Sequence, residues 1–207
     1  KKLGTYGLMS NFSFYYAHHM STIEGGMVCT DNEDIYQMLR MFRSHGMVRE
    51  ATDERLRSQY ATTHMDLNPD FIFAYPAFNV RNTEICAVIG RNQLRRLDKN
   101  NQKRIKNHEI FLEHLDETMF RTDFDCEGSC NYAFNVILRE PDLKLRNQLE
   151  DAMRESKIEF RRGSAGGGNQ MRQPYLSSVI AEGAWERFPE VEHIHHYGWY
   201  VGNYPDL

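Results

Sequence analysis

The chain has 207 residues, of which 41% are hydrophobic and 12% aromatic, as expected for a globular protein of one or two domains with a sizeable core. Its 25 lysines and arginines are outnumbered by 29 aspartates and glutamates, and the formal net charge of −4 argues against non-specific binding to nucleic acid. No apolar stretch approaches the ~20 residues of a membrane span, and no signal sequence opens the chain. We therefore expect a cytoplasmic protein with reduced thiols and neither a membrane nor a nucleic-acid partner.

Short strands are predicted first. Residues 3–14 indicate two strands around Ser10-Asn11, and Gly26–Thr30 indicates a further strand entered through two glycines. The stretch between them is expected to be a loop.

A helix follows these strands. Thr30 and Glu33 have the spacing of a capping box, and the apolar residues after them repeat with helical spacing until Gly46. Residues 47–78 are rich in charge, Asp, Asn and Pro, and predict a long irregular excursion over the surface.

The second half of the chain indicates mixed α and β structure. Residues 83–115 have a long helical pattern with a break or bend expected at 98–102. Residues 132–138 predict a strand, Pro141 is expected to open a helix, and residues 158–161 predict another strand. These elements indicate a small α+β domain at the C-terminal end.

The run Ser13–Met27, SFYYAHHMSTIEGGM, resembles the cofactor segment of the fold-type-I sugar aminotransferases, which bind pyridoxal phosphate (PLP). The family pattern is roughly S-F-x-x-x-K-x-x-T-T-x-E-G-G, and counting from Ser13 or from Glu24 places His18 at the lysine position. Lysine can condense with PLP, whereas imidazole can only take and return protons near neutral pH. The resemblance therefore implies a non-covalently held cofactor, most usefully pyridoxamine phosphate (PMP), with His18 as the catalytic residue.

The resemblance also implies the fold. It predicts an α/β chain that is the C-terminal part of a fold-type-I PLP-dependent transferase, similar to aspartate aminotransferase. Residues 1–100 would be the end of the large cofactor-binding domain with its mixed sheet, and residues 101–207 the small domain with its linking helix. We expect the chain to be a piece of a longer protein and to be inactive alone.

A lysine-to-histidine exchange resembles the sugar 3-dehydratases of this family. One kind uses PLP and glutamate alone on a GDP-sugar, and a second kind acts on CDP-sugars and adds an iron-sulfur cluster. Four converging thiolates are needed for an ordinary cluster, and no cysteine-rich ligand loop is present. We therefore favour the cluster-free kind and interpret Cys126 and Cys130 as ordinary thiols. No metal is expected, because neither histidine-rich stretch has the His-Glu-x-x-His spacing of a helical metal site. These stretches contain His193, His195 and His196, and His108, Glu109 and His114.

Two further residues match the family's cofactor-binding positions. Ser13 matches the serine whose hydroxyl holds the cofactor phosphate. Asn79, in YPAFNVRNTE, matches the asparagine that crosses the interface of a homodimer to the partner's cofactor phosphate. The resemblance thus implies shared active sites, while a solvent-facing serine and a helix-capping asparagine stay open as alternatives.

Four residues are candidates for substrate binding. His45 and Arg49 follow a helix end in RSHGMVR, where a histidine is also favoured by the helix dipole alone. Arg161 matches an arginine of the family's G-I-E-T-R segment. Asn169 belongs to the loop 163–173, which begins with a glycine-rich run and is similar to a substrate-facing loop of the GDP-sugar enzymes or is a flexible connector.

The resemblance implies 3-dehydration of a nucleotide-activated 4-keto-6-deoxy sugar, namely GDP-4-keto-6-deoxy-D-mannose, with L-glutamate regenerating PMP. This reaction belongs to 3,6-dideoxysugar (O-antigen) biosynthesis. Two alternatives remain: a nucleotide-sugar 4-aminotransferase, and a catalytically inactive regulatory or binding protein with a PLP fold.

Overall fold

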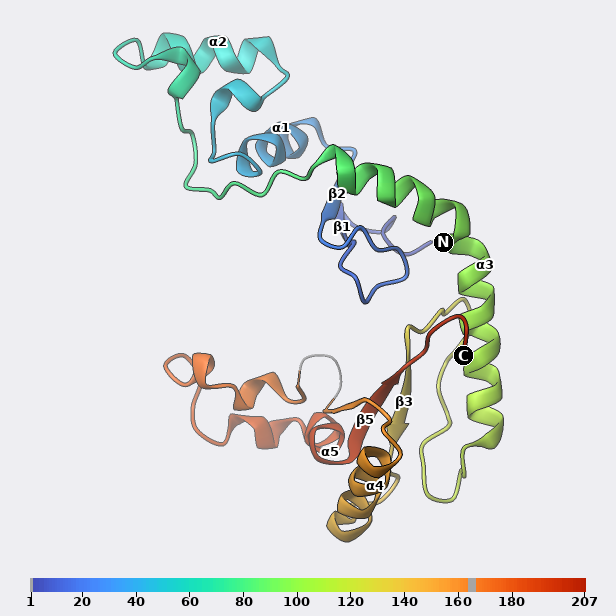
Figure 1. Ribbon diagram of the computed structural model, residues 1–207. Helices are drawn as coiled ribbons and strands as arrows, with labels where there is room; N and C mark the ends of the chain where they lie inside the picture. The colour runs from blue at the N-terminus through green and yellow to red at the C-terminus, as the bar shows by residue number, and fades with distance from the viewer. Residues whose placement is uncertain (1, 164–166) are drawn as a thin grey trace. The chain divides into compact units, whose positions relative to one another are not determined.

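The computed structural model describes residues 2–163 and 167–207, and the chain divides into two compact units, Lys1–Leu97 and Asp98–Leu207. The long helix α3 (Glu84–His114) begins in the first unit and ends in the second (Figure 1). It runs through residues 98–102 without interruption, so the break expected there is absent. That segment contains neither proline nor glycine, and its polar residues do not prevent continued helical hydrogen bonding. Among the described helices, none is long and apolar enough to cross a membrane.

A two-stranded hairpin opens the first unit. Strand β1 (Met9–Ser13) pairs antiparallel with β2 (Gly26–Thr30), and Ser13 lies opposite Gly26. The bounds of β2 are those predicted, but the two strands expected in 3–14 are one. Ser10-Asn11 lies inside β1, because its partner in β2 keeps the segment extended.

The first helix, α1 (Glu33–Phe42), begins at a different cap from the one predicted. The Asn32 side chain accepts a hydrogen bond from the Ile35 backbone at 2.9 Å, and Asn32 is therefore the N-cap. Thr30 instead donates its hydroxyl to the Leu8 carbonyl and accepts from the Asn32 backbone. The helix ends at Phe42 rather than continuing to Gly46.

The excursion over 47–78 is ordered. It contains helix α2 (Glu54–Thr63), with 3₁₀ turns at Val48–Glu50 and Pro69–Phe71 (Figure 1). The prediction of an irregular loop was wrong, because local caps and a small apolar cluster order this segment. That cluster contains the buried residues Met41, Val48, Ala51 and Ile72.

The second unit contains a three-stranded antiparallel sheet of order β3-β5-β4. Strands β3 (Ala133–Ile137) and β4 (Phe160–Arg162) confirm the two predicted strands with shifted ends. Helix α4 (Leu143–Glu155) is capped by Asp142, so Pro141 precedes the cap rather than opening the helix. Helix α5 (Pro189–Tyr197) and strand β5 (Gly198–Gly202) complete the unit and were not predicted.

The core of the second unit is built around Trp199 on β5, which is 1% exposed and packs with Leu138 and Phe120. Its indole donates a hydrogen bond of 3.0 Å to the buried carboxylate of Glu150. Burial by itself would raise the pKa of Glu150. The hydrogen bonds from Trp199 and Arg154 and the nearby guanidinium of Arg162 outweigh burial, so that this pKa lies below its ordinary value.

We expect this carboxylate to make the second unit sensitive to acid. Because the folded-state pKa of Glu150 is depressed, its stabilising contribution is complete above the unfolded-state pKa of about 4.3 and is lost as the pH falls through the lower folded value. Glu150→Gln should lower the unfolding free energy by about 1–3 kcal/mol at pH 7. On acidification the unfolding free energy of this variant should fall by less than that of the unchanged chain. Urea unfolding followed by tryptophan fluorescence at pH 7 and pH 3 measures both effects.

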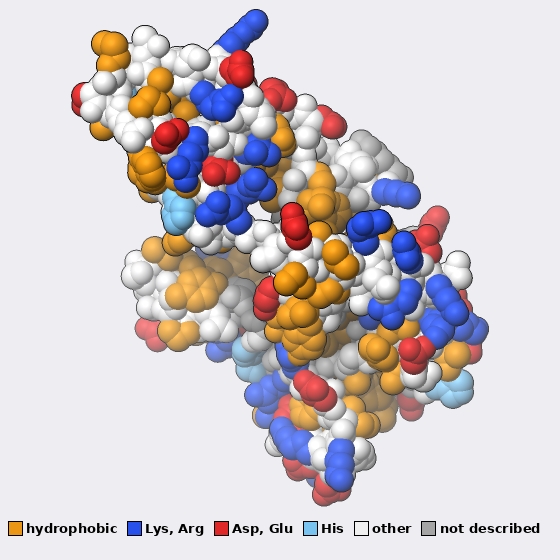
Figure 2. All heavy atoms as spheres, turned by 45° about the horizontal axis from the view of Figure 1, so that its top comes forward, with side chains coloured by type: hydrophobic (Ala, Val, Ile, Leu, Met, Phe, Trp, Pro, Cys, Tyr) orange, Lys and Arg blue, Asp and Glu red, His pale blue; other side chains and the backbone are white. Residues whose placement is uncertain are grey.

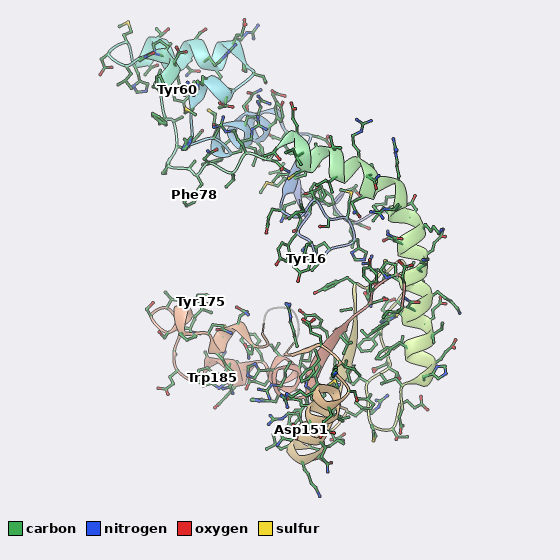
Figure 3. The ribbon with its side chains drawn as sticks, viewed as in Figure 1. Tyr16, Tyr60, Phe78, Asp151, Tyr175 and Trp185 are labelled. Atoms are coloured by element: carbon green, nitrogen blue, oxygen red, sulfur yellow. The ribbon has the colours of Figure 1, made fainter. Side chains whose placement is uncertain are left out.

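The matched control for Glu150 is Asp151→Asn. Asp151 pairs with the same Arg154 at 2.9 Å but is exposed (Figure 3). Its removal should change the unfolding free energy by no more than about 1 kcal/mol. Equal effects of the two substitutions would contradict a special role for the buried carboxylate.

Candidate functional site

The loop Phe14–Gly25 connects β1 to β2 and is closed at its neck. The Phe14 amide donates to the Gly25 carbonyl at 2.9 Å, and the Thr22 amide donates to the Phe14 carbonyl at 2.8 Å. Thr22 is 3% exposed and donates its hydroxyl to the Glu24 carbonyl at 2.6 Å. The neck is thus fixed by backbone contacts, and the loop presents the residues between them at the surface.

His18 lies in this loop with an exposed side chain. Its backbone amide donates to the Tyr15 carbonyl at 3.0 Å, and its ring meets the Tyr15 ring edge to face with 6.3 Å between centroids. The neighbouring His19 is half-buried. An exposed imidazole on an anchored loop can exchange protons with a bound molecule.

Ser13 is the last residue of β1, at the foot of the same loop. It is exposed, and its hydroxyl oxygen accepts a hydrogen bond from the Tyr15 amide at 3.3 Å, which leaves the hydroxyl proton for an anionic acceptor. At Gly25, with φ 142°, a Cβ atom would lie 2.8 Å from both the Thr22 hydroxyl and the Asn82 amide nitrogen. Residue 25 therefore favours glycine, which has no Cβ. The Ser13 hydroxyl, together with backbone that carries no side chain at Gly25, suits the binding of a phosphate group.

The RSHG segment and the Asn79 segment lie side by side in the first unit. The His45 amide donates to the Phe78 carbonyl at 2.8 Å, and the Val80 amide donates to the Arg43 carbonyl at 2.9 Å. The structure therefore brings together two residues that the sequence separates, His45 and Asn79.

Gly46 makes this pairing possible. Its φ is 76°, and a Cβ atom at this position would lie 2.0 Å from the Tyr75 carbonyl oxygen. The preceding His45 also has a left-handed backbone, with φ 59°. The sharp reversal after α1 thus needs glycine at residue 46 and places strain on the backbone of His45.

Asn79 does not cap a helix. It forms a β-bridge with Ser44, and α3 begins only at Glu84. The Asn79 side chain is exposed, and its oxygen accepts from the Arg81 guanidinium at 3.0 Å. The capping alternative is therefore wrong, and the amide nitrogen remains available as a donor.

Arg49 lies in the 3₁₀ turn after this reversal, with its guanidinium 5.1 Å from the Phe71 ring centroid. It borders an open hollow of about 360 Å³, lined by Val48, Arg49, Glu54, Arg57, Ser58, Ala61, Pro69 and Asp70. Stacking on the aromatic ring holds the guanidinium in place for a planar anionic partner.

The remaining candidates lie in the second unit. Arg161 on β4 donates to the Tyr200 hydroxyl at 3.2 Å, and its guanidinium lies 5.9 Å from that ring centroid. Asn169 is 2% exposed, accepts from the Met171 amide at 3.0 Å and donates to Glu192 at 2.8 Å. Its side chain is therefore used inside the chain. Residues 164–166 of the predicted substrate loop lie outside the described residues.

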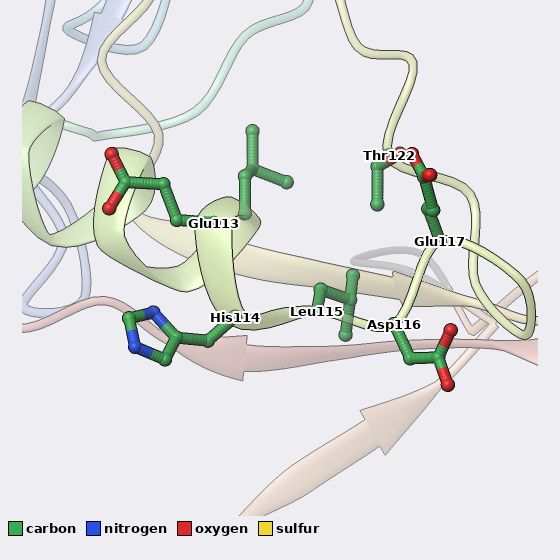
Figure 4. Close-up of a pocket in the computed structure, with 7 residues that line it drawn as sticks. Glu113, His114, Leu115, Asp116, Glu117 and Thr122 are labelled. Carbon is green, nitrogen blue, oxygen red and sulfur yellow. The ribbon is translucent and has the colours of Figure 1, made fainter.

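One further hollow, of about 420 Å³, lies at the end of α3 (Figure 4). It contains none of the predicted site residues and is lined by Leu112, Glu113, His114, Leu115, Asp116, Glu117 and Thr122. Among the described residues, no group of three or more histidine, cysteine or acidic side chains could hold a metal ion.

Comparison with known proteins decides the family. The family model described as the DegT/DnrJ/EryC1/StrS aminotransferase family matches residues 1–206. The chain belongs to this family. The family resemblance drawn from the His18 and Asn79 segments is thereby confirmed.

Curated members of the family named GDP-4-keto-6-deoxy-D-mannose 3-dehydratase are similar over 99% of the chain. The protein from Yersinia pseudotuberculosis is 31% identical and that from Escherichia coli O55:H7 is 29% identical. The chain covers 51% and 52% of their lengths, so it spans about half of each relative.

A crystal structure described as GDP-4-keto-6-deoxymannose-3-dehydratase with a trapped PLP-glutamate geminal diamine superposes with a TM-score of 0.78. It is 28% identical, and the match covers 99% of this chain and 53% of that one. The predicted α/β fold of the PLP-dependent aminotransferase class is thereby confirmed.

Proposed function

We propose that the chain is the His18-bearing part of a PLP/PMP-dependent nucleotide-sugar 3-dehydratase. The observation that supports this most is the histidine at the lysine position of a family built around that lysine. Relatives with the dehydratase name match nearly the whole chain. The proposed substrate is GDP-4-keto-6-deoxy-D-mannose, with L-glutamate as the amino donor.

The residues of the first unit fit a phosphate-bearing cofactor. Ser13 offers a hydroxyl at the foot of the His18 loop, and Asn79 offers an exposed amide nitrogen. We infer that Ser13 binds the phosphate of its own protomer's cofactor and that Asn79 binds that of the partner in a homodimer. The first unit would then belong to the large cofactor-binding domain and the second to the small domain.

PMP, when bound, supplies a primary amine for the sugar's C4 ketone and a pyridine ring that takes up electrons. His18 removes a proton from the carbon that carries this amine and then protonates the C3 hydroxyl as it leaves as water. Imidazole suits both steps, because its ordinary pKa of about 6.5 lies close to neutral pH. The released products are the 3-deoxy-4-keto sugar and ammonia, and glutamate leaves as 2-oxoglutarate when the amine is restored.

The substrate-binding residues are proposed by their chemistry. Arg49 and Arg161 each carry a guanidinium close to an aromatic ring, and each by itself suits an anionic group of a nucleotide sugar. His45 lies beside Asn79 and can donate to the sugar. Asn169 belongs to the proposed substrate loop, and its buried side chain shapes that loop by accepting a hydrogen bond from the Met171 amide.

The experiment is to incubate the whole protein, including any residues that precede or follow this chain, with PLP, L-glutamate and GDP-4-keto-6-deoxy-D-mannose. We expect a product lighter by one oxygen, with release of ammonia. Mass spectrometry of the nucleotide sugar together with an ammonia assay measures this. An amino sugar of nearly unchanged mass would show an aminotransferase instead, and no conversion of this substrate would contradict the proposal.

A further inference from the structure

The segment from Gly167 to His196 is ordered with almost no apolar core. Among its described residues only Asn169 is buried, although the segment includes three 3₁₀ turns, Gln170–Arg172, Pro174–Leu176 and Ala184–Arg187, and most of α5. Its aromatic side chains, among them Tyr175 and Trp185, lie near the surface (Figure 3). Polar contacts must therefore supply most of its order.

Glu192 on α5 is the centre of these contacts. Its carboxylate accepts a hydrogen bond of 2.8 Å from the side-chain amide of Asn169. The Nε atom of Arg172 donates to both carboxylate oxygens, at 2.9 and 3.0 Å, and Nη2 of Arg172 forms a further ion pair with Glu192. The hydrogen bonds from Arg172 outweigh partial burial and lower the pKa of Glu192 to about 2. The carboxylate is therefore ionised, and fully engaged, throughout the range in which proteins are usually studied.

Arg172 joins three pieces of chain. It belongs to the turn after Asn169, it binds Glu192 on α5, and its guanidinium lies 4.8 Å from the Trp185 ring centroid. The Nε and Nη2 atoms of Arg172 are both engaged by the Glu192 carboxylate, so the main role of this guanidinium in the structure is to join the turn to α5.

Helix α5 also holds the backbone of the loop. The backbone amide of Asn169 donates to Nδ1 of His195 at 3.1 Å, and this hydrogen bond requires Nδ1 to be unprotonated. Burial and the neighbouring His196 lower the pKa of His195, which favours the neutral ring that this hydrogen bond needs. A Cβ atom on Gly168, with φ 92°, would lie 2.1 Å from the same nitrogen. The loop therefore approaches α5 as closely as glycine permits.

We infer that Glu192 and Arg172 are positioning residues that fix the loop Gly167–Gln173 for the nucleotide sugar. This inference rests on the proposed function for the ligand, but the clamp itself is a property of the chain. The Glu192 and Arg172 side chains bind each other within the second unit, and neither residue was a candidate from the sequence. Their effect on the reaction is through substrate binding.

The first test measures the clamp in the chain as it stands. In Glu192→Gln the amide nitrogen opposes the Arg172 guanidinium, so hydrogen exchange of the amides in Asn169–Gln173 should accelerate by about tenfold or more. Amides of β3 and β5 should keep their exchange rates. The matched control is Glu190→Gln, which removes an exposed ion pair of the same helix to Arg121 and leaves the loop untouched. Unchanged exchange in Glu192→Gln, or equal acceleration in β5, would overturn the clamp.

The second test measures its use by the whole enzyme. Glu192→Gln should raise KM for the nucleotide sugar by about tenfold and leave kcat within about twofold, and Glu192→Asp should restore KM in part. A fall in kcat at constant KM would overturn the positioning role. Absence of turnover in the unsubstituted enzyme would instead overturn the proposed function, and the exchange result would still stand on its own.

Discussion

His18→Asn in the whole protein is expected to slow the proposed 3-dehydration by about 10²–10⁴-fold, because asparagine keeps polarity and similar size but cannot carry a proton from the amine-bearing carbon to the C3 hydroxyl. PLP should still bind, since Ser13 and the neck of the loop are unchanged. Single-turnover product formation measured by mass spectrometry, with cofactor absorbance recorded in parallel, separates the two effects. Turnover that survives this change would mean that another residue is the base.

His18→Lys extends the same experiment. A primary amine at this position should capture the cofactor covalently and divert or abolish dehydration. His19→Asn is the matched control, because His19 is the adjacent imidazole but is half-buried. It should leave the rate of product formation within about twofold of the unchanged protein. Unchanged 3-deoxy product from the lysine variant would contradict the role assigned to His18.

Gly46→Ala is expected to lower the unfolding free energy of the first unit by about 2–5 kcal/mol. The left-handed backbone accounts for about 1–2 kcal/mol of this, and the contact of Cβ with the Tyr75 carbonyl oxygen for the rest. That oxygen belongs to the backbone and cannot rotate away. Because Gly46 ends the reversal that pairs His45 with Phe78, the same change should also displace His45 from Asn79.

Gly4→Ala provides the control for Gly46. Gly4 lies in the same unit with a similar φ of 87°, but its Cβ would meet side chains and no backbone: the end of the exposed Phe12 ring at 2.9 Å, which can move, and the Ser10 hydroxyl at 3.5 Å. The loss should therefore stay near the left-handed cost of about 1–2 kcal/mol. Urea unfolding followed by circular dichroism compares the two variants. If Gly46→Ala and Gly4→Ala lower the unfolding free energy equally, the close approach of the Tyr75 carbonyl oxygen to residue 46 does not affect stability.

Elements with a strong apolar pattern could be predicted from the sequence. Helix α1 buries Met41 on one face, and β3 buries Ala133, Phe134 and Ile137. In contrast, α2 and α5 contain no buried residue, and the apolar face of α2 is limited to partly buried residues such as Leu56 and Tyr60. Helix α2 begins at the Asp53 cap, whereas α5 has no side-chain cap and is held by contacts with distant residues such as Asn169. Local spacing in the sequence does not report such contacts.

The candidate site divides in the same way. His18, Ser13 and Asn79 could be proposed from the sequence because each belongs to a short motif with fixed spacing. Glu192 was not found, because its partners Asn169 and Arg172 lie far from it in sequence and no motif joins them. Only the folded chain shows that an unremarkable glutamate of α5 is bound to the predicted substrate loop.

His45 has a further consequence for how this sequence can change. Its left-handed backbone, with φ 59°, costs stability that glycine at the same position would return. A population of variants selected for thermal resistance alone would therefore be drawn toward glycine at residue 45. Selection for catalysis would resist that drift only if the imidazole contributes to it. The occupant of this single position, followed through laboratory evolution under each pressure, would report whether the histidine is kept for chemistry or is merely tolerated.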